Sequence, residues 1–184
     1  GAGNGKVLPG SPGYFEAAAQ VPLLEAGRAA DRAQGDVHPM GNPHVYMDPE
    51  RMAQVAAALA ERLATLDPAG AAGYRSGAAA FRKAVDARVP AWKAKAAGAG
   101  SIVAFHKDLV YLAALLGVAV TGYVEPLPGI PPTAAHLSDL TTRLKGKKGV
   151  ILYTDFQPGK GPEFLSRNLG WPQVRLPLEP PVGA

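Results

Sequence analysis

Two amphipathic helical patterns dominate the first half of the chain. Asp48 and Pro49 fit an N-cap and a first helical position, because the carboxylate can accept bonds from free backbone N–H groups and proline needs no donor there. Apolar residues then recur at three- and four-residue steps: Met52, Val55, Leu59, Leu63 and Leu66. Asp67-Pro68 repeats the start signal, and a second stripe follows: Tyr74, Ala78, Phe81, Val85, Val89 and Trp92. We expect two consecutive helices, the second long and stiff.

From residue 101 onward, short apolar runs alternate with helical periods. The apolar runs predict four strands, at residues 101–105, 118–124, 149–153 and 174–178. The helical periods fall between them, at residues 109–116, after Pro132-Thr133, and at 163–169. Gly117 and Gly170 close two of these helices, at a position that favours glycine. This alternation predicts an α/β fold with a mostly parallel four-stranded sheet flanked by helices.

Composition narrows the classes of function. Charged residues make up 18% and apolar residues 47% of the chain, which is typical of a helix-rich globular protein. The net charge of +4 comes from lysines and arginines spread along the chain, with no stretch that interleaves them with aromatic residues, so we expect no nucleic-acid partner. Cysteine is absent, and any metal must therefore be held by His, Asp or Glu. No apolar run approaches the length of a membrane span, and we expect any export signal to lie outside this chain.

Two of the four histidines lie at the ends of predicted elements. His44 is in a loop bracketed by Pro43 and Pro49, just before the first helix. His106 directly follows the first predicted strand, at the carboxyl end where open α/β sheets bind ligands. A structural histidine held by hydrogen bonds is the alternative for each of them, and the residues alone leave it open.

Other classes of protein lack their usual motifs here. A zinc hydrolase needs a water-activating carboxylate beside an open coordination position, as in HExxH, and no such pattern occurs. A nucleotide-binding module needs a glycine-rich turn, but Gly159-Lys160-Gly161 lacks both the P-loop and the dinucleotide spacing. We therefore expect no enzyme. A metal-dependent hydrolase and a purely structural or partner-binding α/β domain remain the alternatives.

Four segments match the motifs of one known family. Residues 42–49, NPHVYMDP, resemble its signature NPHxWxDP, and residues 103–112, VAFHKDLVYL, resemble a second signature in which a ligand residue follows a strand. Glu125-Pro126 with Pro131-Pro132-Thr133 is similar to a third motif. Residues 153–157, YTDFQ, resemble a fourth, where the family usually has Glu before Pro-Gln. The chain thus resembles the periplasmic solute-binding proteins of zinc and manganese ABC transporters, the cluster A-I metal receptors.

The resemblance implies a two-lobed α/β receptor whose lobes are joined by one long helix, with the metal between them. Residues 1–48, which are rich in Gly and Pro with one short helical pattern at 15–24, would be a remnant of the N-terminal lobe with the metal-site loop. Residues 49–98 would form the helical segment with the interlobe helix, and residues 99–184 the C-terminal α/β lobe. Family members have a longer N-terminal lobe with one further ligand histidine, so we expect a fragment.

The resemblance also implies a function. The protein would capture a divalent cation outside the cytoplasm, in the periplasm or anchored to the outer side of the membrane, and deliver it to the membrane permease of an ABC transporter as a monomer. His44 and His106 would bind the metal, and Asp155 would either add a carboxylate or be structural. Manganese receptors commonly carry a carboxylate where His106 stands, so Zn²⁺ is the expected cargo, with Mn²⁺ or Fe²⁺ as alternatives.

Three further residues are weaker candidates. His38 would be a remnant of a histidine-rich loop or a solvated loop residue, and His136 would lie at the surface or near the site. Glu179 occupies the region where the family has a terminal carboxylate, but its surroundings are a poor match. We expect Tyr46 and Asp48 to support the local geometry by packing and by capping.

Overall fold

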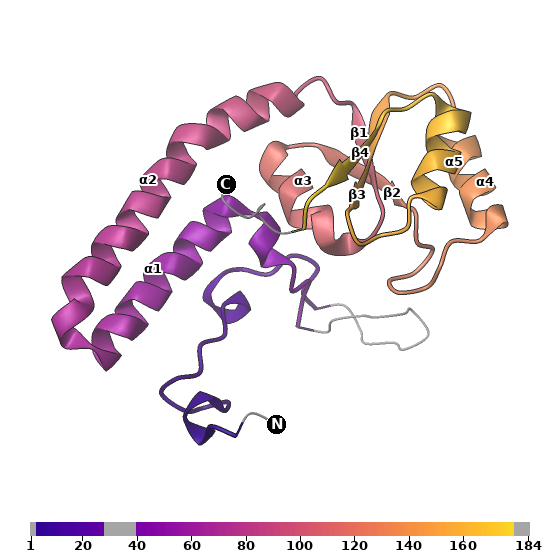
Figure 1. The fold of residues 1–184 in the computed structure, drawn as a ribbon. Coiled ribbons are helices and arrows are strands. Elements are labelled where there is room, and N and C mark those ends of the chain that lie inside the picture. Colours follow the sequence, from indigo (N-terminus) through magenta and orange to yellow (C-terminus); the bar gives the residue numbers. More distant parts are fainter. Residues whose placement is uncertain (1–2, 28–39, 179–184) are drawn as a thin grey trace.

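The computed structural model describes residues 3–27 and 40–178 (Figure 1). The two weak candidates His38 and Glu179 lie outside the described residues. The expected division into residues 1–48, 49–98 and 99–184 stays a prediction.

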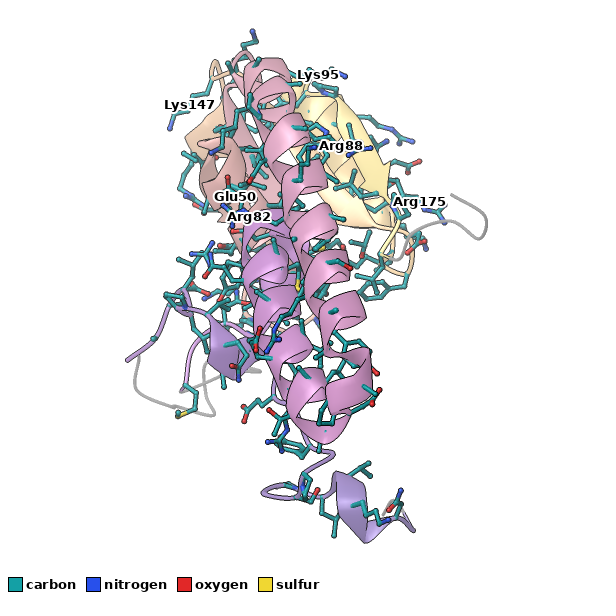
Figure 2. All side chains as sticks on the ribbon, turned by 90° about the vertical axis from the view of Figure 1, so that its left-hand side faces the viewer. Glu50, Arg82, Arg88, Lys95, Lys147 and Arg175 are labelled. Carbon is teal, nitrogen blue, oxygen red and sulfur yellow. The ribbon has the colours of Figure 1, made fainter. Side chains whose placement is uncertain are left out.

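The first half of the structure is built around a helical hairpin. Helix α1 spans Pro49–Leu66 and helix α2 spans Ala71–Ala96, joined by a 3-10 turn at Pro68–Gly70. Asp48 caps α1 as expected, because its Oδ1 accepts hydrogen bonds from the N–H groups of Glu50 and Arg51. The two helices run antiparallel (Figure 1), and Arg82, Arg88 and Lys95 of α2 are exposed (Figure 2).

The apolar stripes of this hairpin are only partly buried. Val85 and Val89 are buried on α2, whereas the buried residues of α1 are mostly small: Ala53, Val55, Ala60 and Ala64. Leu59 and Phe81, both members of the predicted stripes, are 36% and 43% exposed. The hairpin extends away from the sheet, so its far end packs mainly on itself (Figure 1), with one hydrogen bond from Arg62 to the Ser11 carbonyl of the N-terminal segment. Helical periodicity therefore predicted the two helices correctly, but only some of the side chains that they bury, such as Val55, Val85 and Val89.

The second half contains the predicted sheet. Strands β1 (Ser101–Ala104), β2 (Ala119–Tyr123), β3 (Gly149–Thr154) and β4 (Gln173–Leu176) form one sheet in the order β2-β1-β3-β4. All three neighbouring pairs are parallel. The carboxyl ends of β1 and β3, the two central strands, therefore lie side by side at one edge.

Helices cover both faces of the sheet. Helix α3 (Val110–Leu116) lies on the face toward the hairpin, and α4 (Ala134–Leu144) and α5 (Lys160–Leu169) lie on the other (Figure 1). Because strand side chains alternate between faces, β1 contributes Ile102 and Ala104 to the cluster under α3, and Val103 to the cluster under α4 and α5. The α/β fold predicted from the sequence is confirmed, although α5 begins at Lys160, ahead of the expected residue 163.

The segment before the hairpin has little regular structure. The helical pattern expected at residues 15–24 forms only a 3-10 turn at Ala18–Gln20. Val21 is nevertheless buried, in a cluster with Val45, Val55 and the fully buried Tyr111 of α3. The segment is thus held by packing and not by a helix of its own. Across the described residues, none of the helices is sufficiently long and apolar to cross a membrane.

Candidate metal centre

His106 lies where the central strands end. Backbone pairing continues one residue beyond β1, since the Phe105 N–H donates to the Leu152 carbonyl at 2.9 Å and the Glu125 N–H donates to the Phe105 carbonyl at 3.1 Å. His106 comes next and precedes a 3-10 turn, Lys107–Leu109, that leads into α3. His106 therefore lies at the edge of the sheet where the carboxyl ends of the strands meet, as the sequence predicted.

His44 reaches the same edge from a different part of the chain. It precedes a short 3-10 turn, Val45–Met47, whose end is fixed by the capping residue Asp48. The buried Asn42 holds the loop in place, because its Oδ1 accepts from the His44 N–H at 3.0 Å and its Nδ2 donates to the Lys107 carbonyl at 2.8 Å. The loop of His44 is thus bonded directly to the residue that follows His106.

The two imidazole rings meet edge to face. Their centroids are 5.4 Å apart and their planes are inclined by 88°. Both side chains are half-buried, and both line a pocket of about 290 Å³ at the carboxyl edge of the sheet. Other polar residues of its lining are Tyr46, Asp108, Glu125 and Gln157. The structure therefore brings together the two histidines that the sequence singled out.

Each imidazole has a polar partner at its Nδ1 atom. The Nδ1 of His106 lies 2.7 Å from Oε2 of Glu125, and the Nδ1 of His44 lies 3.3 Å from the Tyr46 hydroxyl. Burial raises the pKa of the Tyr46 phenol, and the charge of Asp108 raises it further. Both rings are therefore anchored through one nitrogen, which is the usual arrangement for histidines that bind a metal through the other.

A buried carboxylate lies behind the pair. The Asp108 side chain is 2% exposed, and its Oδ2 accepts a hydrogen bond from Nε2 of Gln157 at 2.9 Å. Its Oδ1 has no hydrogen-bond partner among the described protein groups. Burial raises the pKa of this carboxyl group, and the nearby charge of His106 acts in the opposite direction. The surroundings of Asp108 therefore favour its neutral form more than water does.

The other predicted site residues lie outside this pocket lining. Asp155 follows β3 at the same edge, but it is exposed and its Oδ1 accepts from the Leu178 N–H at 3.4 Å. His136 is on α4, with its Nε2 2.9 Å from the Tyr123 carbonyl oxygen. Within the described parts of the chain, no three His, Cys, Asp or Glu side chains gather closely enough to hold a metal ion. The two histidines form a pair without a third clustered ligand there.

Sequence reasoning did not identify the roles of Glu125, Asp108 and Gln157. Glu125 and Gln157 lie in the third and fourth motifs, which supported the family resemblance but assigned no role to either side chain. Asp108 lies two residues after His106, within the second motif, and nothing in the sequence marked it as a site residue. The missing signal was spatial, because the contact between Glu125 and His106 depends on the parallel pairing of β1 and β2.

The family-model match and the similar curated proteins point to the same family. The family model described as ZnuA, zinc-uptake complex component A, periplasmic, matches residues 5–180. Among curated proteins, the high-affinity zinc uptake system protein ZnuA of Brucella abortus (strain 2308) is 24% identical over 143 residues, which are 77% of this chain and 42% of that protein. The chain therefore spans less than half the length of this relative.

Solved structures show the same fold. The solute-binding protein FpvC of Pseudomonas aeruginosa in complex with Mn²⁺ is 29% identical, with a TM-score of 0.69 over 88% of this chain and 58% of that one. FpvC in complex with Ni²⁺ is 26% identical, with a TM-score of 0.70 over 93% of this chain and 61% of that one. These similarities again cover less than two thirds of the longer proteins.

Proposed function

Because the chain belongs to the ZnuA family of periplasmic zinc-uptake components, we propose that it captures a divalent cation, preferentially zinc, for delivery to the permease of an ABC transporter. His44 and His106 are the proposed ligands. The observation that carries the proposal is their convergence: two imidazoles from distant parts of the sequence meet with ring centroids 5.4 Å apart in one pocket.

The chemistry of the pair supports zinc as the cargo. Imidazole nitrogen suits Zn²⁺, whereas Mn²⁺ prefers carboxylate, carbonyl and water oxygen. In a zinc site each histidine would bind through a neutral ring nitrogen at about 2.0–2.1 Å. Manganese and iron are the alternative cargoes, and FpvC, described with Mn²⁺ and Ni²⁺, illustrates that solved relatives of this fold bind several metals.

Two nitrogen ligands make only half of a tetrahedral zinc site. The remaining positions would be filled by water, by Asp155 or by ligands from a longer protein. We therefore expect this chain alone to bind zinc weakly, and a longer parent protein to bind it tightly. A receptor built in this way would recognise the ion through ligand type and geometry, and release it when the loops that hold the histidines shift.

Competition of the chain with a zinc indicator dye tests the proposal. His44→Ala and His106→Ala should each lower zinc affinity by a factor of ten or more. His136→Ala is the matched control, because this histidine bonds to a backbone carbonyl outside the pocket lining and its loss should leave affinity unchanged. Unchanged affinity in both pocket variants would remove the assignment. A manganese titration under the same conditions measures the preference for zinc.

A further inference from the structure

We propose that Glu125 is a positioning residue for His106, which fixes the hydrogen on Nδ1 and leaves Nε2 as the metal-binding atom. This inference rests on the proposed function, in which His106 is a ligand. Its basis is the contact of 2.7 Å between Oε2 of Glu125 and Nδ1 of His106.

The hydrogen bonds around Glu125 determine which group is the donor. The N–H of Gly129 donates to the same Oε2 atom at 3.1 Å, so this oxygen is already acting as an acceptor toward a backbone donor. An ionised carboxylate can only accept, and the Nδ1 of His106 must then carry the hydrogen that lies between the two residues. A neutral imidazole with hydrogen on Nδ1 has its free lone pair on Nε2.

The sheet itself brings Glu125 to His106. Glu125 follows β2 directly, and its N–H donates to the Phe105 carbonyl at 3.1 Å, which extends the parallel pairing of β1 and β2 by one step. The two side chains therefore leave neighbouring strands at the same level. Their exposed fractions are only 15% for Glu125 and 20% for His106, so water competes weakly for the hydrogen bond.

The arrangement has two consequences for a bound cation. Anchoring Nδ1 removes the rotational freedom of the ring, so the ligand atom is oriented before the metal arrives. A carboxylate on the opposite nitrogen also makes the imidazole a stronger electron donor, as in known carboxylate–histidine–zinc arrangements. The corresponding contact at His44 is a Tyr46 hydroxyl at 3.3 Å, which is longer and carries no full charge. Glu125 thus orients His106 through a charged partner.

The tautomer of His106 in the metal-free chain tests this proposal directly. Two-bond ¹H–¹⁵N correlation spectra at about pH 8 distinguish hydrogen on Nδ1 from hydrogen on Nε2. We expect the Nδ1–H tautomer in the unsubstituted chain and a shift toward Nε2–H, the form that free histidine prefers, in Glu125→Ala. Glu163→Ala removes an exposed glutamate of α5 and should leave the His106 signals unchanged.

Two results would overturn the proposal: an Nε2–H tautomer in the unsubstituted chain, or an unchanged Nδ1–H population in Glu125→Ala. If Glu125→Ala does not fold, the nearly isosteric Glu125→Gln takes its place and should reduce the Nδ1–H population, since a neutral amide is the weaker acceptor. Zinc affinity should fall 10- to 100-fold in Glu125→Ala. If no variant binds zinc, including the unsubstituted chain, the proposed function fails while the tautomer still decides the role of Glu125.

Discussion

The side-chain amide of Asn42 donates a hydrogen bond of 2.8 Å to the carbonyl oxygen of Lys107, 65 residues further along the chain. The same side chain accepts a hydrogen bond from the His44 N–H through its Oδ1. One buried residue therefore joins the loop that carries His44 to the turn that follows His106. The distance between the two proposed ligands is set by the protein itself, before any metal is bound.

Replacing Asn42 should loosen this connection. Asn42→Ala leaves the Lys107 carbonyl and the His44 N–H without their partner, and we expect a loss of about 1–3 kcal/mol in the free energy of unfolding. Zinc affinity should fall together with stability, because His44 is no longer held against His106. Urea denaturation and dye competition measure the two effects. Asn168→Ala is the control: its amide bonds only to a carbonyl of its own exposed helix turn.

Tyr111 provides a second link between the same segments. Its hydroxyl donates to the Asn42 carbonyl at 2.6 Å and accepts from the Leu24 N–H at 2.9 Å, and the ring is fully buried. Tyr111→Phe should cost about 1–3 kcal/mol in unfolding free energy, because two backbone groups lose their partner. Thermal denaturation checks this. The exposed Tyr14, changed to Phe, should have little effect, and equal stability of the two variants would contradict the link.

Zinc binding should depend on pH in the direction expected for imidazole ligands. A histidine must lose its proton before it can bind a metal, so affinity should decrease as the pH drops below about 6.5 and be retained above it. Dye competition from pH 8 to pH 5 measures the profile. A flat profile over this range would indicate that carboxylates hold the ion, and His44 and His106 would then not be the ligands.

Position 149, at the start of β3, has no room for a side chain, so only glycine fits there. A Cβ at this position would meet the indole ring of Trp171 and the carbonyl oxygen of Ser101, both too close for a real contact. Gly149→Ala should therefore destabilise the fold by about 1–3 kcal/mol through overpacking. Gly98→Ala serves as the control, because a Cβ there meets nothing within 4 Å. Denaturant midpoints of the two variants should differ clearly.

The connection of the hairpin contains a carboxyl group with a shifted pKa. The Tyr74 hydroxyl donates to Oδ2 of Asp67 at 2.7 Å, and this hydrogen bond is the main cause that lowers the Asp67 pKa. A lowered pKa favours the ionised form in the fold, so the stabilisation is fully present above the ordinary pKa of Asp and is lost as the pH falls through the lowered pKa of the folded state. Tyr74→Phe should return the Asp67 pKa toward its usual value, as a ¹³C carboxyl titration would detect.

Much of the fold could be predicted from the sequence because its signals are local. The cap at Asp48, the proline after it and the glycines that close α3 and α5 act within one helical turn, and each end of a helix marked in this way lies close to its expected position. The exception at α5, which begins at Lys160, occurs where the chain has no capping side chain to mark the start. Strand positions followed from apolar runs for the same local reason.

The sequence by itself determined the five α-helices from residue 49 onward, the strands, the α/β class and the two histidines at element ends, whereas the helical pattern at residues 15–24 formed only a 3-10 turn. The tertiary structure alone decided the strand order, the meeting of His44 with His106, the contact of Glu125 with His106, and the exposure of Asp155 outside the pocket lining. It also left Leu59 and Phe81 half-exposed, contrary to their periodic pattern. The physical reason is the separation of the interacting residues along the sequence. Capping and periodicity act between near neighbours. A binding pocket needs side chains that come together only when distant strands pair and distant loops pack.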